Sequence, residues 1–200
     1  YAINKVGCKA LILAASFKSS NYIAMVEELA PEISKSKPGE INSIRLPTLK
    51  TVIQIGGETN DGYFDFEQIP TLASTKDHQQ IESLSDQLQF DDPINIQFTS
   101  GTTGFPKGAT LTHFNVLNNG YFTGEGLKLS SNDKLCVPVP LYHCFGMVLS
   151  NVAALTHGTA LVYPAEAFDP LTVLESIEAE RCTALHGVPT MFIAELGHPR

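Results

Sequence analysis

The chain has 200 residues, of which 43% are hydrophobic and 17% charged, a balance typical of a soluble globular protein with a substantial core. Its net charge of −8 provides no basic surface for nucleic acid or anionic lipid, so the composition excludes both partners. The longest apolar stretch, residues 146–163, is interrupted by Ser, Asn, Thr and His and is too polar to cross a bilayer.

The first half of the chain alternates strand-like and helix-like segments. Apolar runs at residues 9–15 and 49–57 have the length of buried strands, and helical spacing between them predicts a helix at 21–30 with Asn21 as its N-cap. Residues 58–92 are polar and turn-rich, although 77–88 have a helix-forming composition. This alternation predicts an α/β fold with much parallel sheet.

The second half continues the alternation. A strand at 94–98 is followed by an extended segment at 109–113 and by a helix from about Asn115. Further elements are predicted as strands at 134–143, 158–164 and 183–189, the last running into a proline turn, and as a helix at 169–182 that begins with Asp169 and Pro170. Gly, Ser and Asn at 124–133 indicate a joint, which predicts sub-domains at 1–124 and 132–200.

One loop, "FTSGTTGFPKG" at residues 98–108, combines glycines with hydroxyl side chains and one lysine. Glycines allow successive backbone N–H groups to turn toward one centre and bind an anion, and Lys107 adds a full positive charge. This set of donors suits a polyphosphate. A surface hairpin without a ligand is the plain alternative, but the ordered string T-S-G-T-T-G-x-P-K-G is hard to reach by chance.

Two common nucleotide motifs do not match this loop. The P-loop needs G-x-x-x-x-G-K-[ST] leading directly into a helix, whereas here Pro106 stands before Lys107 and the following residues look extended. The dinucleotide fingerprint G-x-G-x-x-G fails because the glycines fall at positions 101, 104 and 108. An ordinary kinase or ATPase is therefore disfavoured.

The loop resembles the phosphate-binding signature of the adenylate-forming superfamily, which includes acyl-CoA synthetases, nonribosomal-peptide adenylation domains and luciferases. "PLYHCFGM" at 140–147 resembles the P-L-[FY]-H-x-x-G segment of that family, and "GVPTMF" at 187–192 resembles its V-P-x-x segment. The stretches "DPINIQFTSGTTG" and "HGVPTMF" are most similar to the medium-chain fatty acyl-CoA synthetase branch. The resemblance extends through essentially the whole chain.

The resemblance implies a layered αβαβα fold with two sheets, and a ligase that works in two steps. A carboxylate attacks the α-phosphate of ATP, and the thiol of coenzyme A then takes the acyl group from the adenylate. Implied co-substrates and cofactors are ATP, coenzyme A and Mg²⁺. The loop would bind the nucleotide through nine residues: Thr99, Ser100, Gly101, Thr102, Thr103, Gly104, Phe105, Pro106 and Lys107.

The resemblance also implies roles outside the loop. Lys107 and His143 would act at the catalytic centre, and the acid would contact His143, His186, Val188 and Pro189. A structural role is the alternative for both histidines, and plain core packing is the alternative for Val188 and Pro189. Cys144 beside His143 is not expected to form a reactive pair. No metal site is predicted in this chain, because the histidines lack ligand spacing.

The same resemblance places several parts of the enzyme outside this chain. The Y-G-x-T-E segment, the later aspartate for the ribose and the C-terminal domain with its catalytic lysine are absent, so we expect the isolated chain to be inactive. The first residue is Tyr1 rather than methionine, which indicates a piece of a longer protein, called the parent protein below.

Three functions remain open for the parent protein. The first is a ligase for medium-chain fatty acids, the second an aryl or amino acid adenylation enzyme, and the third a non-catalytic nucleotide-binding or interaction module. Assembly is also open, with a homodimer as one alternative. Four cysteines without a CxxC pair predict reduced thiols, which fit the cytoplasm or the mitochondrial matrix.

Overall fold

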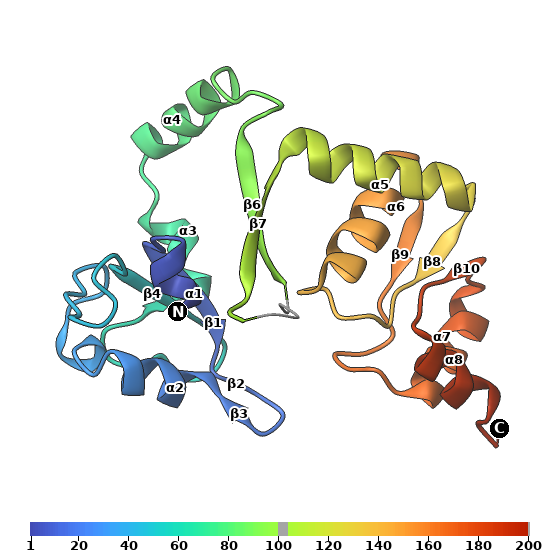
Figure 1. Cartoon of the computed structure of the whole chain (residues 1–200), viewed down its shortest axis with the longest axis horizontal. Helices are drawn as coiled ribbons and strands as arrows, with labels where there is room; N and C mark the ends of the chain where they lie inside the picture. The colour runs from blue at the N-terminus through green and yellow to red at the C-terminus, as the bar shows by residue number, and fades with distance from the viewer. Residues whose placement is uncertain (100–103, 200) are drawn as a thin grey trace. The chain divides into compact units, whose positions relative to one another are not determined.

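A computed structural model describes residues 1–99 and 104–199, which fold as two compact units, Tyr1–Leu88 and Gln89–Arg200 (Figure 1). Each unit contains a three-stranded parallel sheet with helices beside it, which confirms the predicted α/β class. The boundary between the units falls between Leu88 and Gln89, and the sub-domains predicted at 1–124 and 132–200 stay a prediction.

The first unit is built on a sheet of order β1-β4-β5, formed by Ala10–Ala14, Thr51–Ile55 and Phe64–Asp65. The two predicted strands pair in parallel, with Ala10 opposite Thr51. Helix α2 (Tyr22–Leu29) connects them after the short hairpin β2–β3 (Ser16–Phe17 and Ser20–Asn21). The predicted cap is present, because the Asn21 side chain accepts from Ala24 N–H at 2.9 Å.

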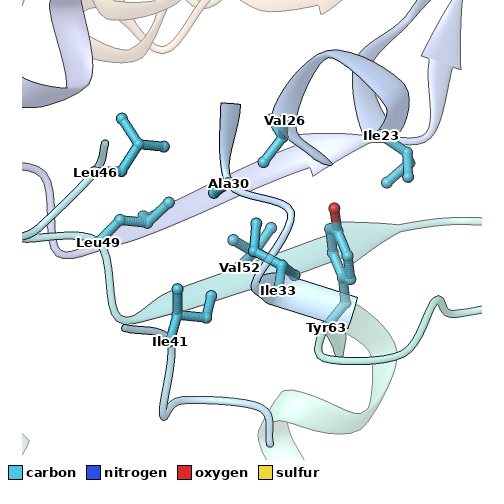
Figure 2. Close-up of a cluster of buried hydrophobic side chains, with 9 residues drawn as sticks. All are labelled: Ile23, Val26, Ala30, Ile33, Ile41, Leu46, Leu49, Val52 and Tyr63. Carbon is cyan, nitrogen blue, oxygen red and sulfur yellow. The ribbon is translucent and has the colours of Figure 1, made fainter. Parts of the chain in front are cut away.

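The core of the first unit lies between α2, the sheet and the segment around η1 (Ile33–Lys35), as Figure 2 shows. Ile33 and Val52 are completely buried there. Gln54 is buried as well, but its amide bonds to Gly56 O, Glu58 O and Asn60 N at 2.9–3.1 Å. The side chain therefore organises the loop after β4 without leaving a buried polar group unsatisfied.

Short helices fill the rest of the first unit: α1 (Ala2–Lys5), η2 (Phe66–Gln68), α3 (Ile69–Leu72) and α4 (Thr75–Ser85). The helix expected at 77–88 begins two residues earlier, because Ser74 and Asp77 form a capping box. Every residue of α4 is exposed.

The second unit has a sheet of order β10-β8-β9, formed by Ala184–Leu185, Lys134–Cys136 and Ala160–Val162. All three strands are shorter than predicted. Strand β8 ends before Pro138 and Pro140, which cannot donate to a sheet ladder. Leu135 and Val137 nevertheless remain in the core, together with Ala153.

Five helices lie in the described part of this unit: α5 (His113–Leu127), the π-helix η3 (Phe145–Val152), α6 (Ala153–His157), α7 (Pro170–Glu180) and α8 (Pro189–Leu196). Asp169 caps α7 as predicted, accepting from Thr172 N–H at 2.9 Å. Helix α8 corrects the sequence prediction, since Pro189 starts a helix rather than a turn. Residues 124–127, at the start of the predicted joint, belong to α5.

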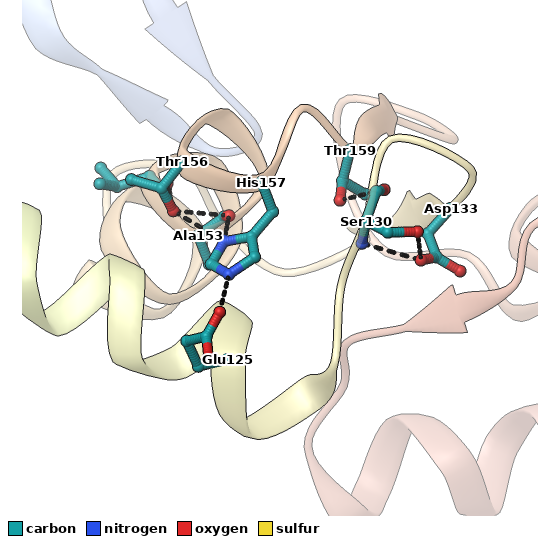
Figure 3. Close-up of polar contacts among 8 residues, drawn as sticks. Glu125, Ser130, Asp133, Ala153, Thr156, His157 and Thr159 are labelled. Carbon is teal, nitrogen blue, oxygen red and sulfur yellow. Dashed lines mark hydrogen bonds and ion pairs between the residues drawn. The ribbon is translucent and has the colours of Figure 1, made fainter.

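Polar contacts tie α5 to the elements that follow it (Figure 3). His157 Nε2 lies 3.1 Å from Glu125 Oε1, and its Nδ1 lies 3.1 Å from Ala153 O. After the helix, the Asp133 carboxylate accepts from Ser130 N–H and Oγ–H at 2.9 and 2.7 Å. Hydrogen bonds from Ser130 and Thr183 lower the pKa of Asp133, so the turn is stabilised by an ionised carboxylate.

Candidate functional site

The glycine-rich loop joins the two strands of an antiparallel hairpin, β6 (Pro93–Thr99) and β7 (Lys107–Thr112), in the second unit (Figure 1). Phe98 lies opposite Gly108, and Thr99 lies opposite Lys107. A Cβ on Gly108 would stand 3.0 Å from Ile96 Cγ2, a tight contact from which the isoleucine would have to shift slightly. The extended conformation predicted after the loop is confirmed and separates this site from a P-loop, which would open a helix here.

Of the nine predicted nucleotide-binding residues, five are described: Thr99, Gly104, Phe105, Pro106 and Lys107. The other four, Ser100, Gly101, Thr102 and Thr103, lie outside the described residues. All five described residues are exposed. Gly104 has φ of 104°, a conformation that disfavours any side chain.

The end of the hairpin brings one hydroxyl and one cation together. Thr99 Oγ1 donates to Lys107 O at 3.4 Å, so the two residues flank the loop at a fixed register. The lysine side chain is exposed and is therefore available to a ligand. Residues 104–110 are exposed throughout, which leaves the backbone of this arm accessible as well.

The opposite end of the hairpin is anchored to α5. Phe114 N–H donates to Phe90 O at 2.8 Å, and the two rings meet edge to face with centroids 6.0 Å apart. Thr112 and Asn115 form a capping box that starts α5 directly after β7, two residues before the predicted start. The loop is thus carried by two strands whose base is fixed to a helix.

The "PLYHCFGM" segment forms the entry to the π-helix η3. His143 N–H donates to Pro140 O at 3.2 Å, and Met147 N–H donates to His143 O at 2.9 Å. Gly146 is buried against this turn, since a Cβ there would stand 2.4 Å from Pro140 O. The spacing between Pro140 and Gly146 in this segment therefore has a structural cause, a close backbone approach.

The exposed ring of His143 has a defined tautomer. Its Nδ1 accepts from Phe145 N–H at 3.1 Å, so in the neutral ring the proton is on Nε2, which is left as a donor. Cys144 Sγ lies 3.9 Å from the same Nδ1, so these neighbours do meet. The lone pair of Nδ1 is already used by the backbone, which leaves no base to activate the thiol.

His186 lies at the end of β10 and is fixed on both sides. Its N–H donates to Cys136 O at 3.0 Å, and Nδ1 lies 2.8 Å from Ser150 Oγ on η3. The ring also packs against Phe145, with centroids 5.1 Å apart. Burial lowers the pKa of His186, so the neutral imidazole is favoured.

The predicted residues therefore fall into groups. Thr99 and Lys107 meet on the hairpin, whereas His143 and His186 are both attached to Phe145, through its N–H and its ring. Val188 is the N-cap of α8 and Pro189 its first residue. Sequence reasoning missed Ser150, although a serine inside the apolar run of residues 146–155 was a signal for a buried hydrogen bond.

A cavity of about 710 Å³ lies between α5 and the first turns of η3, within the size range of small-molecule sites. Its walls include Phe114, Phe122, Cys144, Val148 and Leu149. His186, Val188 and Pro189 are not among the described residues that line it. Among the described residues that line the cavity, only Cys144 is a sequence neighbour of a predicted site residue, His143.

No group of three or more His, Cys, Asp or Glu side chains in the described part of the chain is arranged to hold a metal ion. Within residues 1–99 and 104–199, no helix has both the length and the apolar character needed to cross a membrane.

Comparison with known proteins gives one family and a consistent set of relatives. The family profile described as AMP-binding enzyme matches residues 1–200. The chain is 46% identical to a putative acyl-CoA synthetase, YngI, of Bacillus subtilis (strain 168), covering all of this chain and 36% of that protein. It is 45% and 41% identical to the mitochondrial medium-chain acyl-CoA ligase ACSF2 of Danio rerio and Homo sapiens, again over the whole chain and 33% of each relative.

Solved structures agree on the fold. The chain superposes on an anthranilate CoA ligase, AuaEII, in complex with anthranoyl-AMP, with a TM-score of 0.75 and 20% identity, covering 100% of this chain and 34% of that one. A long-chain-fatty-acid-CoA ligase from Archaeoglobus fulgidus gives a TM-score of 0.61 at 21% identity, covering 97% and 33%. The chain thus spans about a third of the length of the curated relatives it matches.

Proposed function

The chain belongs to the AMP-binding enzyme family, and on that premise we propose that its parent protein is an ATP-dependent fatty acid–CoA ligase. It forms an acyl-adenylate and pyrophosphate, and then acyl-CoA and AMP. The relatives named as medium-chain acyl-CoA ligases support medium-chain acids as the substrates. This chain carries the phosphate-binding hairpin and part of the acyl site, and is inactive alone.

The hairpin holds the β- and γ-phosphates. Lys107 supplies the positive charge, Thr99 flanks the loop and bonds to Lys107 O, and Gly104 keeps the loop free of a side chain where the backbone turns. Ser100, Gly101, Thr102 and Thr103 complete the contact by resemblance. Charge that develops on the leaving pyrophosphate is stabilised by groups already in place, which is the main source of catalysis in such reactions.

Magnesium supplies positive charge to the phosphates when it is bound with ATP. The described residues of this chain do not fit a metal held by the protein, since they contain no suitable group of ligands. We therefore assign the protein ligand of Mg²⁺ to a part of the parent protein outside this chain.

His143 works at the junction of the nucleotide and acyl sites. Phe145 N–H occupies Nδ1, so the neutral ring offers Nε2–H as a donor in one orientation. A donor held in this way suits an anionic oxygen of the carboxylate or of the α-phosphate. His186, Val188 and Pro189 contribute to the acyl site at the start of α8.

Family membership over residues 1–200 is the observation that carries this proposal, because it covers both the hairpin and the His143 segment. The free cysteines and the mitochondrial relatives support a location of the parent protein in the cytoplasm, or in the mitochondrial matrix if it is eukaryotic. A homodimer is its proposed assembly, to be checked by sedimentation of the parent protein.

The test is carboxylate-dependent exchange of pyrophosphate into ATP by the parent protein, across acetate, octanoate, palmitate, benzoate and amino acids. We expect exchange to peak at octanoate and to fall about 100-fold in Lys107→Ala, the scale of a lost charge-stabilising contact. Lys76→Ala, on the exposed helix α4, is the matched control and keeps full exchange. A peak at benzoate or at an amino acid would favour the adenylation enzymes, and no exchange at all would contradict a ligase.

A further inference from the structure

The buried Ser150 and the half-buried His186 form a polar pair whose contact the proposed function does not use. Ser150 is completely buried within the π-helix η3, and His186 is fixed to β8 by its backbone N–H. The Ser150 hydroxyl lies 2.8 Å from His186 Nδ1 and 3.0 Å from Phe145 O. These two contacts, with the donor and acceptor capacity of each group, favour one position of the imidazole proton.

A serine hydroxyl has one proton, and here it is given to the Phe145 carbonyl, which can only accept. The same Oγ must then accept from His186, so Nδ1 carries a proton. Burial favours the neutral ring, in which the other nitrogen has no proton. His186 Nε2 is therefore a bare acceptor, and the Phe145 ring at 5.1 Å restricts rotation of the imidazole.

This acceptor has no partner within the described part of the protein, although the side chain is half-buried. A ligand that donates a hydrogen bond to this nitrogen binds more tightly, whereas a ligand that covers it with carbon leaves it unsatisfied and binds more weakly. An unsubstituted aliphatic chain covers the nitrogen with carbon. A hydroxylated chain can donate to it.

We propose that Ser150 is a positioning residue that fixes the tautomer of His186, so that Nε2 accepts a hydrogen bond from a hydroxyl group on the acyl chain of the substrate. The inference rests on the proposed function and on His186 contributing to the acyl site. It narrows the substrate class to medium-chain acids that carry a hydroxyl, in preference to unsubstituted acids of equal length.

The experiment compares octanoate with a set of octanoates that each carry one hydroxyl at a different carbon, using pyrophosphate exchange by the parent protein. At least one isomer is expected to exceed octanoate in kcat/KM by about 3- to 10-fold, the effect of one hydrogen bond. The gain should lie in KM, because the contact forms when the acid binds.

Two substitutions of His186 distinguish the roles of its two ring nitrogens. His186→Asn places an amide near the position of Nδ1, so it keeps a donor toward Ser150 and removes the Nε2 acceptor. His186→Gln reaches toward the position of Nε2 and gives up the Ser150 contact. We expect the preference for the hydroxylated acid to disappear in the Asn variant and to survive in part in the Gln variant. Ser150→Ala should reduce the preference for the hydroxylated acid, and Ser83→Ala on the exposed helix α4 should leave this preference unchanged.

A second measurement does not depend on turnover. Nitrogen-15 NMR of the parent protein labelled at histidine reports which imidazole nitrogen carries the proton, and we expect Nδ1 for His186. A proton on Nε2 would overturn the assignment even if the Ser150 variant did not fold. Exchange with octanoate but no preferred isomer, or a preference that survives His186→Asn, would overturn the substrate class. Absence of exchange with every acid would instead remove the proposed function, and this inference with it.

Discussion

Gly124 lies directly against the imidazole of His157: a Cβ added to this glycine would stand 2.3 Å from Nδ1. The close approach lets the next residue along α5, Glu125, reach His157 Nε2 at 3.1 Å. One turn earlier, a Cβ on Gly120 would stand 2.5 Å from Val152 Cγ1. Helix α5 therefore packs against α6 and the end of η3 along two buried glycines.

This packing predicts that a side chain at position 124 destabilises the folded protein. Gly124→Ala should lower the free energy of unfolding by about 1–3 kcal/mol, because the methyl group overpacks a site that has no space. Urea denaturation of the chain, followed by circular dichroism, measures the change. Gly126→Ala on the same helix is the control, since nothing lies within 4 Å of its Cβ position. That control should be neutral or stabilising by up to about 1 kcal/mol, and equal destabilisation by both variants would contradict the packing argument.

Tyr63 provides a prediction for the first unit. Its ring is buried, but its hydroxyl has no hydrogen-bond partner among the described residues, and burial, with a contribution from Glu27, raises the pKa to about 12. Tyr63→Phe should raise the free energy of unfolding by about 1 kcal/mol, because an unsatisfied polar group leaves the core. Thermal melts at pH 7 test this, with Tyr22→Phe on α2 as the control. A clear loss of stability would mean that the hydroxyl has a partner.

Glu195 makes the second unit sensitive to pH. Burial raises the pKa of its carboxyl above the ordinary value of 4.5, and Oε1 has no partner in the described part of the chain. Since the folded pKa lies above the unfolded one, the stability from this group is complete below the unfolded pKa and is lost as pH rises through the folded pKa. Glu195→Gln should therefore stabilise the unit more at pH 8 than at pH 4.5. Glu178→Gln on the exposed face of α7 serves as the control, and a gain independent of pH would contradict the role of charge.

Gly146 predicts a loss of activity in the parent protein. Gly146→Ala would place a methyl group 2.4 Å from Pro140 O, which must shift the turn that carries His143. We expect kcat/KM for pyrophosphate exchange to fall about 10-fold or more, as for a small displacement near a reacting centre. Gly126→Ala on α5 is a control with an open Cβ position. Normal exchange by a folded Gly146→Ala variant would show that the turn does not position His143.

Local signals predicted much of the fold. Asn21 and Asp169 are N-caps in the sequence and in the structure, because a side-chain oxygen two or three residues before an N–H is a short-range contact. The hairpin around the loop was also predictable, since alternation on both sides of a turn sets the strands. The reaction was predicted from the family resemblance, because no local sequence pattern specifies it.

Other features depend on long-range packing. Pro189 looked like the end of a strand, but proline suits the first turn of a helix equally well, and the sequence did not decide between them. The pairing of Ser150 with His186 joins residues 36 positions apart, so no spacing rule finds it. The close approach of Gly124 to His157 is likewise a long-range contact that no spacing rule finds.

The π-helix η3 has a consequence for insertions and deletions in this segment. Ala153 N–H reaches back five residues to Val148 O, so the segment from Phe145 to Val152 holds a wider turn than an α-helix does. The wide turn accommodates one residue more than an α-turn, so removing one residue would restore ordinary winding while α6 keeps its face toward α5. Residues within the segment, Ser150 among them, would change direction relative to His186. Relatives of different length in this segment should therefore differ in the side chains they present beside His186, even where the flanking residues are the same.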